Sequence, residues 1–327
     1  MWNKFPMKLF SAFLPAVLLF MSLAAKAQEI PPPDTVTTGL YVTSIYDIDF
    51  RQREYTVNLW LWLKYKNRAF DFVHNIEIPA AKNFTQTYVT VDSSGGQYYV
   101  IMKLQCVMRN NTKTDNFPFD KQRLWFSIEN SQYDSTALVF AVDTTGDLYD
   151  KKYSLQGWDI DSCKVSVGTK LYKTAFGSTA LEKPEARYST FRLITVIKRE
   201  PLGLFLKLFL GMYIAFLIAF VCFFIHADGM DSRFGLSVGA VFAVIGNKYI
   251  IDSSLPETVT FTLVDKLHGI TLFFILLVVI ATAYSLQLVK QNKIYEAKRF
   301  DMRSGQVFII GYVLINVYLI WRAYHVH

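Results

Sequence analysis

Residues Leu202–Ala227 read LGLFLKLFLGMYIAFLIAFVCFFIHA, and this nearly unbroken apolar run decides the fold class of the chain. An α-helix rises about 1.5 Å per residue, so roughly 20 apolar residues cross a hydrocarbon core about 30 Å thick. Three further apolar runs follow, at Phe234–Ile251, Leu267–Val289 and Val307–Trp321. The second domain, residues 199–327, is therefore predicted to be a bundle of four transmembrane helices. We expect them at about residues 202–227, 234–251, 260–289 and 305–322.

Basic residues are concentrated between the third and fourth runs, in a short loop expected near residues 290–304. They are Lys290, Lys293, Lys298, Arg299 and Arg303. Loops rich in Lys and Arg remain on the cytoplasmic side of a membrane. Counting spans from this loop places the C-terminus and the domain before the first span on the opposite side. We therefore expect a multi-pass protein of the inner (plasma) membrane, with both of these parts periplasmic or extracellular.

The first 27 residues have the pattern of a removable signal peptide. Lys4 and Lys8 precede the apolar run Leu9–Leu23, and small residues follow at Ala25-Lys26-Ala27. An uncleaved anchor helix is the alternative interpretation. Either one predicts that residues 28–198 are exported, in agreement with the charge pattern of the later loop.

Residues 28–198 contain many short alternating segments, such as Tyr55–Leu63, separated by turn-forming segments such as Asp92–Gly96. This pattern predicts an antiparallel, immunoglobulin-like β-sandwich. Successive side chains of a strand point to opposite faces. Trp60 and Trp62 are thus expected on the outer face, opposite a row of leucines in the core. Large aromatic side chains on an outer face indicate an interface or a ligand site.

The composition fits a membrane protein, because 52% of the residues are hydrophobic and 19% are charged. The net charge of +7 is spread over loops and does not indicate nucleic-acid binding. Of the three cysteines, Cys222 falls within a span, and pairing of Cys106 with Cys163 remains open. The five histidines are scattered, so no metal site or cofactor is predicted. The chain also lacks a nucleophile elbow, a P-loop and an HExxH motif, so the sequence does not predict an enzyme.

The sharpest short motif is Phe117–Gln122, FPFDKQ, a turn fixed by proline with an aromatic residue on each side. A β-rich domain contains this turn, and a basic residue and a proline, Arg199 and Pro201, precede the four apolar runs. This order resembles that of the pentameric ligand-gated ion channels (the Cys-loop receptor superfamily). The cysteines that name the family would fall at Asn110 and Leu124, and bacterial members also lack them. The chain is therefore identified as a bacterial member, which implies a homopentamer.

The resemblance implies a ligand site built from aromatic residues of neighbouring subunits, which attract cations through their rings. The candidate residues are Trp60, Phe84, Tyr133, Tyr172 and Tyr188. Burial in the sandwich core is the alternative for each of them. Ser131 stands where nicotinic receptors carry a tryptophan, which argues against a quaternary-ammonium agonist. Another small molecule, or protons acting on Asp134 or Glu185, remains open.

The resemblance also assigns the second apolar run to the pore, with Leu255-Pro256 at its outer end. The implied pore-lining residues are Asp231, Gly235, Gly239, Phe242, Gly246 and Ile250. A ring of Asp231 carboxylates would select monovalent cations, and a ring of Phe242 would form a hydrophobic gate. Asp231 as a helix N-cap is an alternative role that does not exclude the first. Helix packing through Gly235 and Gly239 is the alternative for this face.

The residues expected to couple the two domains are Asp49, Phe117, Pro118, Phe119, Asp120, Arg199 and Pro256. In the family, these positions meet at the membrane surface. We therefore interpret the chain as a homopentameric, cation-preferring channel in contact with membrane lipid and opened by a small-molecule agonist or protons. A non-conducting receptor of the same architecture and a transporter subunit or assembly factor are the alternatives.

Overall fold

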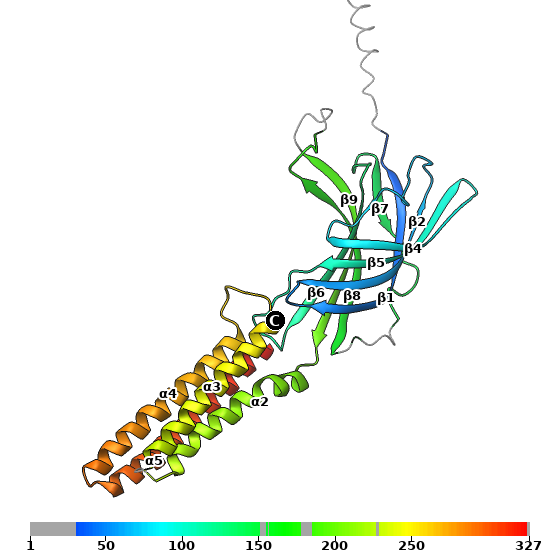
Figure 1. Cartoon of the computed structure of the whole chain (residues 1–327). Helices are drawn as coiled ribbons and strands as arrows, with labels where there is room; N and C mark the ends of the chain where they lie inside the picture. The colour runs from blue at the N-terminus through cyan, green and yellow to red at the C-terminus, as the bar shows by residue number, and fades with distance from the viewer. Residues whose placement is uncertain (1–30, 151–154, 156, 178–184, 227–228, 326–327) are drawn as a thin grey trace, which may run out of the picture.

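The described part of the computed structural model comprises residues 31–150, 155, 157–177, 185–226 and 229–325. The predicted signal peptide lies outside these residues. Figure 1 shows a β-rich unit at one end and a long helical bundle at the other, joined where strand β9 (Ala186–Arg199) leads into helix α2 (Pro201–Phe220). The predicted fold class, a β-sandwich followed by four apolar helices, is confirmed.

The β-rich unit consists of two sheets, with strand orders β4-β5-β2-β1-β7 and β3-β6-β9-β8. The first sheet contains β1 (Asp34–Asp49), β2 (Glu54–Tyr65), β4 (Ala81–Ser94), β5 (Gln97–Arg109) and β7 (Leu138–Val142). The second contains β3 (Ile76–Glu77), β6 (Lys121–Asn130) and β8 (Trp158–Tyr172) besides β9. Neighbouring described strands are antiparallel, except that β7 runs parallel to β1.

Strand β2 separates the core from the outer face by strict alternation. Its leucines at 59, 61 and 63 are fully buried between the sheets, where each contributes about 1.5–3 kcal/mol through the removal of apolar surface from water. Trp60 and Trp62 lie half-buried on the other face. The indole of Trp62 donates to Asp143 Oδ2 at 3.0 Å. Its ring lies so close to Gly39 that a Cβ there would be 2.4 Å from ring atoms, which explains why β1 carries a glycine at this point.

Among the described residues, four helices are long and apolar enough to cross a membrane. They are α2 with the 3₁₀ turn Val221–Phe224, α3 (Met230–Ser254), α4 (Leu263–Lys290) and α5 (Ile294–His325). The chain is thus a multi-pass membrane protein. The fourth helix begins at Ile294 instead of near residue 305, so most of the expected loop at 290–304 is helical, with about three turns of α5 after a short turn. The apolar pattern did not predict this extension, because a segment rich in basic residues can continue a helix beyond the apolar part that crosses the membrane. Ala297, Asp301 and Gly305, one turn apart, bury that extension against the bundle.

Polar side chains inside the bundle join three helices in the half nearest the sandwich. His268 of α4 is fully buried, with one ring nitrogen 2.9 Å from Val264 O and the other 3.0 Å from Asn247 Oδ1 of α3. The Asn247 amide in turn donates to Leu208 O of α2 at 3.0 Å. Because each polar group finds a partner, the cost of removing it from water is offset.

Candidate ligand site, pore and coupling region

An aromatic cluster closes over a buried carboxylate where strands β8 and β9 form a hairpin. The rings of Tyr172, Phe176 and Tyr188 meet edge-to-face, with centroids 5.3–6.3 Å apart. Beneath them, the Glu129 side chain is only 2% exposed. The hydroxyl of Tyr172 donates to Glu129 Oε2 at 2.7 Å. Lys170 Nζ lies 3.8 Å from Glu129 Oε1 and 4.5 Å from the centre of the Tyr172 ring.

Burial gives Glu129 unusual electrostatics. The loss of water raises the pKa of its carboxyl, and Glu77 on the adjacent strand β3 raises it further. The hydrogen bond from Tyr172 and the charge of Lys170 oppose this shift without cancelling it. The Oε1 atom accepts no hydrogen bond from the described residues. The cluster therefore contains an acceptor with unused capacity, placed beneath three aromatic rings.

Sequence reasoning missed Glu129. It follows Ile128 in β6, and its neighbours on the same face at 121, 123 and 125 are exposed. Alternation therefore predicts a solvated acid. The structure buries this position because the β8–β9 hairpin folds over it, and that contact depends on tertiary packing. One feature of the sequence could have indicated Glu129: it is an acid within strand β6, four residues before the candidate ligand-site residue Tyr133.

The structure brings together only some of the predicted ligand-site residues. Tyr172 and Tyr188 share the cluster. Tyr133 packs on Phe70 with ring centroids 4.8 Å apart, and its hydroxyl donates to Ala69 O at 3.2 Å. Phe84 lies on β4 in the other sheet, paired with the buried Cys106. Phe84 therefore does not join the hairpin cluster within one subunit, whereas the charge of Glu77 on β3 acts on Tyr188 and contributes to the raised pKa of its hydroxyl.

Trp60 lies in the other sheet from the hairpin cluster, on the outer face of β2. Its ring meets Tyr88 edge-to-face at 5.4 Å, and Lys103 Nζ lies 5.8 Å from its centre. Trp60 would therefore meet the hairpin cluster only across an interface between two copies of the chain.

The two carboxylates considered as proton sensors have ordinary surroundings. Asp134 Oδ1 accepts from the backbone N–H and hydroxyl of Thr136, at 3.0 and 2.6 Å, and so caps a turn. Glu185 is exposed at the start of β9. Neither has the burial of Glu129, so Glu129 of β6, beneath the hairpin, is the stronger candidate for a proton sensor.

The expected pore face of α3 has no packing partner within the subunit. The residues assigned to it, all exposed, are Asp231, Gly235, Gly239, Phe242, Gly246 and Ile250. Phe242 is 71% exposed at the middle of the helix. The opposite face, which includes Ser237, Ala240 and Val244, is buried against the other helices. Phe242 is therefore available to contact lipid or another copy of the chain.

At the end of α3 far from the sandwich, two charges that are close in sequence lie in different surroundings. Asp231 lies exposed in the first turn, whereas Arg233 is 2% exposed. Arg233 Nη2 lies 2.7 Å from Asp301 Oδ2 of α5, and its Nε donates to Ile225 O at 3.2 Å. The N-cap residue is Gly229, so the alternative role of Asp231 as N-cap is wrong. An acid in the first turn still interacts favourably with the helix dipole.

Arg199 occupies a cage at the junction of the two domains. Its Nε donates to Asp120 Oδ1 at 3.0 Å, so the FPFD turn is tied to the end of β9. The guanidinium carbon lies 3.9 Å from the ring centre of Trp158, 4.8 Å from Phe50 and 5.0 Å from Phe117. Such rings stabilise a cation by about 0.5–2 kcal/mol each, depending on how far water is excluded.

The remaining expected coupling residues divide into two groups. Phe119 contacts the helices directly, with ring centroids 5.6 Å from Phe205 and 6.2 Å from Tyr324, and Pro256 is buried in the α3–α4 link. Asp49 does not reach Arg199: its Oδ1 accepts from Gln52 N at 2.8 Å and closes the β1–β2 turn. Among the described contacts of these residues, Asp120 is therefore the carboxylate that binds Arg199, and Asp49 is not.

Basic residues of the β1–β2 turn, which sequence reasoning missed, contact the helical domain in place of Asp49. Arg51 Nη1 donates to Ser253 O at 3.4 Å, and Arg53 Nη2 donates to Glu257 O at 3.2 Å. Ser253 lies in the last turn of α3, where backbone carbonyls have no partner within the helix, and Glu257 lies in the link to α4. The turn thus touches the end of α3 nearest the sandwich and the link that follows it.

The described residues contain no group of three or more His, Cys, Asp or Glu that could hold a metal ion. All three cysteines are free thiols, so Cys106 and Cys163 are not paired. Burial raises the pKa of the Cys106 thiol to about 12, which makes it unreactive.

No family model matches the chain. A curated relative is 23% identical over 331 residues and is described as a proton-gated ion channel, from Gloeobacter violaceus. The match covers 92% of this chain and 89% of that relative, so it includes both the β-sandwich and the helices.

Proposed function

We propose that this chain, which resembles the bacterial pentameric ligand-gated ion channels in sequence and in fold, is one subunit of a homopentameric ion channel. The resemblance is confirmed by a channel relative that matches along nearly the whole chain and by the order of sandwich and four helices. The single observation that carries the proposal is this end-to-end match to an ion channel. The proposed membrane is the inner membrane, with lipid around the helices and the sandwich on the periplasmic side.

The exposed face of α3 supports its assignment to the pore. In a ring of subunits this face would surround an axis, with Phe242 narrowing the middle and Asp231 at the inner mouth. Five carboxylates at a narrow mouth would concentrate monovalent cations and repel anions. The burial of Arg233 supports this choice, because its positive charge is paired with Asp301 away from that face.

The hairpin cluster is the proposed site of activation. An agonist carrying a positive charge would compete with Lys170 for Glu129 Oε1, which accepts no hydrogen bond from the described residues, and would lie against the faces of Tyr172 and Tyr188. Protons are the second possibility, because a carboxyl with a raised pKa changes its charge at a milder acidity than an exposed glutamate. Trp60 of the neighbouring subunit would complete the site.

A non-conducting receptor of the same architecture is the second candidate. The observation that favours it is the run of Gly235, Gly239 and Gly246 on the exposed face of α3. Glycine lowers helix stability by about 1 kcal/mol relative to alanine, so this helix is poorly suited to hold a fixed pore.

Recording from the purified protein in planar bilayers under a KCl gradient tests the proposal. The pH on the side of the sandwich is lowered stepwise, and small amines are added at neutral pH in a separate series. Discrete openings that reverse near the potassium equilibrium potential support a cation channel, and the two series separate protons from amines. Silence from a verified pentamer under all of these conditions would favour the non-conducting receptor.

A further inference from the structure

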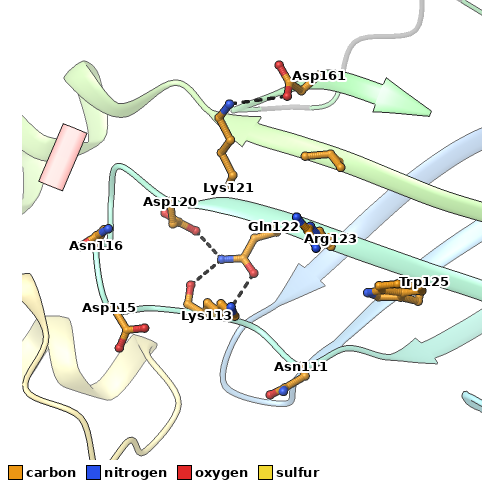
Figure 2. Close-up of a pocket in the computed structure, with 11 residues that line it drawn as sticks. Asn111, Lys113, Asp115, Asn116, Asp120, Lys121, Gln122, Arg123, Trp125 and Asp161 are labelled. Atoms are coloured by element: carbon orange, nitrogen blue, oxygen red, sulfur yellow. Dashed lines mark hydrogen bonds and ion pairs between the residues drawn. The ribbon is translucent and has the colours of Figure 1, made fainter. Parts of the chain in front are cut away.

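A pocket lies on the outer face of the four-stranded sheet, away from the hairpin cluster. Its volume is about 720 Å³. Figure 2 shows that strand β6 forms its floor and that residues 111–116, the segment before the FPFD turn, form one side. Val196 of β9 and Asp161 of β8 line the other side. Asp161 projects into it from an irregularity in the β8–β9 register, and such bulges commonly re-aim a side chain.

The side of the pocket is held in place by Gln122. Its amide nitrogen donates to Lys113 O at 2.6 Å and to Asp120 Oδ2 at 2.7 Å, while its oxygen accepts from Lys113 N at 3.2 Å. The buried amide thus fixes the backbone beside β6 much as a paired strand would. The pocket therefore has preformed walls, which lowers the cost of ordering them when a ligand binds.

The acidic residues of the pocket are all engaged. Asp120 binds Arg199, and Asp115 Oδ1 accepts from Thr260 Oγ1 at 2.9 Å. Asp161 lies 3.6 Å from Lys121 Nζ. Asp120 and Asp161 are therefore paired with cations of the protein, whereas Asp115, bonded to a hydroxyl, keeps its charge at the end of the pocket next to the helices.

Two cations of the pocket remain without such a partner. Within the described part of the chain, the side chains of Lys113 and Arg123 make no hydrogen bond or ion pair, and both are exposed. They come from the side and the floor of the same pocket. Arg123 is directly opposite Val196 in the β6–β9 ladder, and Trp125 follows on the same face with 44% of its surface exposed. The pocket thus offers two positive charges next to an aromatic and an aliphatic wall.

The pocket also borders the membrane domain. Asp115 contacts Thr260, and its backbone carbonyl accepts from Leu263 N at 2.8 Å, at the first residue of α4. Figure 2 shows Asp115 beside that pale yellow segment, while Trp125 lies at the far end of the pocket. A ligand in the pocket would therefore extend from the outer end of a membrane-spanning helix up the face of the sheet.

We propose that this pocket binds a net-anionic phosphate ester, held by Arg123 and Lys113 with its organic part against Trp125 and Val196. A guanidinium fork and a lysine ammonium both bind phosphate oxygens through charge-assisted hydrogen bonds. Phosphoglycerol is the simplest such group, and it is available both as a lipid headgroup at the membrane surface and as a free solute. The proposal depends on the membrane placement of the helices and does not require that the chain conducts ions.

Two binding measurements on the full-length protein test this site. Glycerol 3-phosphate is titrated calorimetrically into protein held in phosphatidylcholine nanodiscs. In parallel, native mass spectrometry measures the retention of phosphatidylglycerol relative to phosphatidylcholine by the detergent-solubilised oligomer. The double variant Lys113→Ala/Arg123→Ala is compared with the control variant Lys66→Ala/Arg68→Ala. The control removes the same charge from the exposed segment that follows β2, outside the pocket. Elution volume and melting temperature verify that both variants are folded.

We expect the pocket variant to weaken phosphoglycerol binding about tenfold or more, and the control variant to bind as the parent does. Loss of lipid retention alone identifies the membrane as the source of the ligand, and loss of calorimetric binding alone identifies a free phosphate ester. Unchanged binding in the pocket variant, equal losses in both variants, or no binding of either ligand to the parent protein would overturn the proposal.

Discussion

Arg199 Nε lies 3.0 Å from Asp120 Oδ1, and this pair joins the FPFD turn to the last strand of the sandwich directly before the first helix. Both side chains are nearly removed from water, with exposed fractions of 11% and 4%. The second oxygen of Asp120 accepts from Gln122. The carboxylate therefore binds both Gln122 of the adjoining strand and Arg199. Phe119 of the same turn packs on Phe205 of α2, so a movement of the turn would displace that contact.

Asp120→Ala should destabilise the protein strongly, because it leaves Arg199 charged in a site that excludes most water. One-sided removal of a buried pair typically costs about 3–5 kcal/mol. Asp120→Asn retains an acceptor and should cost clearly less. Thermal unfolding of the detergent-solubilised protein measures the difference. Equal melting temperatures for the parent and Asp120→Ala would show that the pair does not hold the junction.

Glu129→Gln should flatten the dependence of stability on pH. The pKa of Glu129 is raised above its usual value near 4.5, so the folded state binds this proton more tightly than the unfolded chain does. Ionisation therefore costs stability, and this cost appears as pH rises from about 4.5 through the raised pKa. Melting temperatures of the parent should fall across that window more than those of Glu129→Gln. The exposed Glu185→Gln serves as the control, and it should behave like the parent.

The order of elements could be predicted from the sequence, because hydrophobic period and span length depend on local pattern. What the sequence could not place depends on contacts between distant segments. Glu129 alternates with exposed residues and is buried only by the hairpin of Tyr172. The early start of α5 also depends on a contact between distant segments. Asp301 is an acid in a charged stretch, which predicts exposure, but the fold buries it as the partner of Arg233.

Asp301→Ala should destabilise the inner end of the bundle, because Arg233 would remain buried without its carboxylate. We expect a loss of about 3 kcal/mol or more. The double variant Arg233→Met/Asp301→Leu removes both charges and should recover most of the stability. Thermal unfolding and the fraction of intact oligomer on size exclusion measure both effects. A double variant no more stable than Asp301→Ala would contradict this account.

Asp231→Asn should lower the cation-to-anion permeability ratio, because it removes the charge at the inner end of the exposed α3 face. The reversal potential under a KCl gradient should shift toward zero. Asp252→Asn is the matched control, since its carboxylate lies at the outer end of the same helix and is paired with Lys248 at 2.6 Å. A reversal potential unchanged in Asp231→Asn would remove this residue from the selectivity filter.

Phe242→Ala should raise current in the absence of activation. The ring is 71% exposed in the subunit, and five such rings would exclude water from the middle of the pore. Replacing them with methyl groups widens that constriction and lowers the barrier to hydration, so basal conductance should increase while the pentamer survives. Ile245→Ala is the control, because Ile245 is also exposed and apolar but was not assigned to the pore face. Bilayer recordings from equal amounts of verified pentamer compare the three proteins. If Ile245→Ala leaks and Phe242→Ala remains closed, the register of the helix around the axis is shifted by about 60°, since successive residues are about 100° apart.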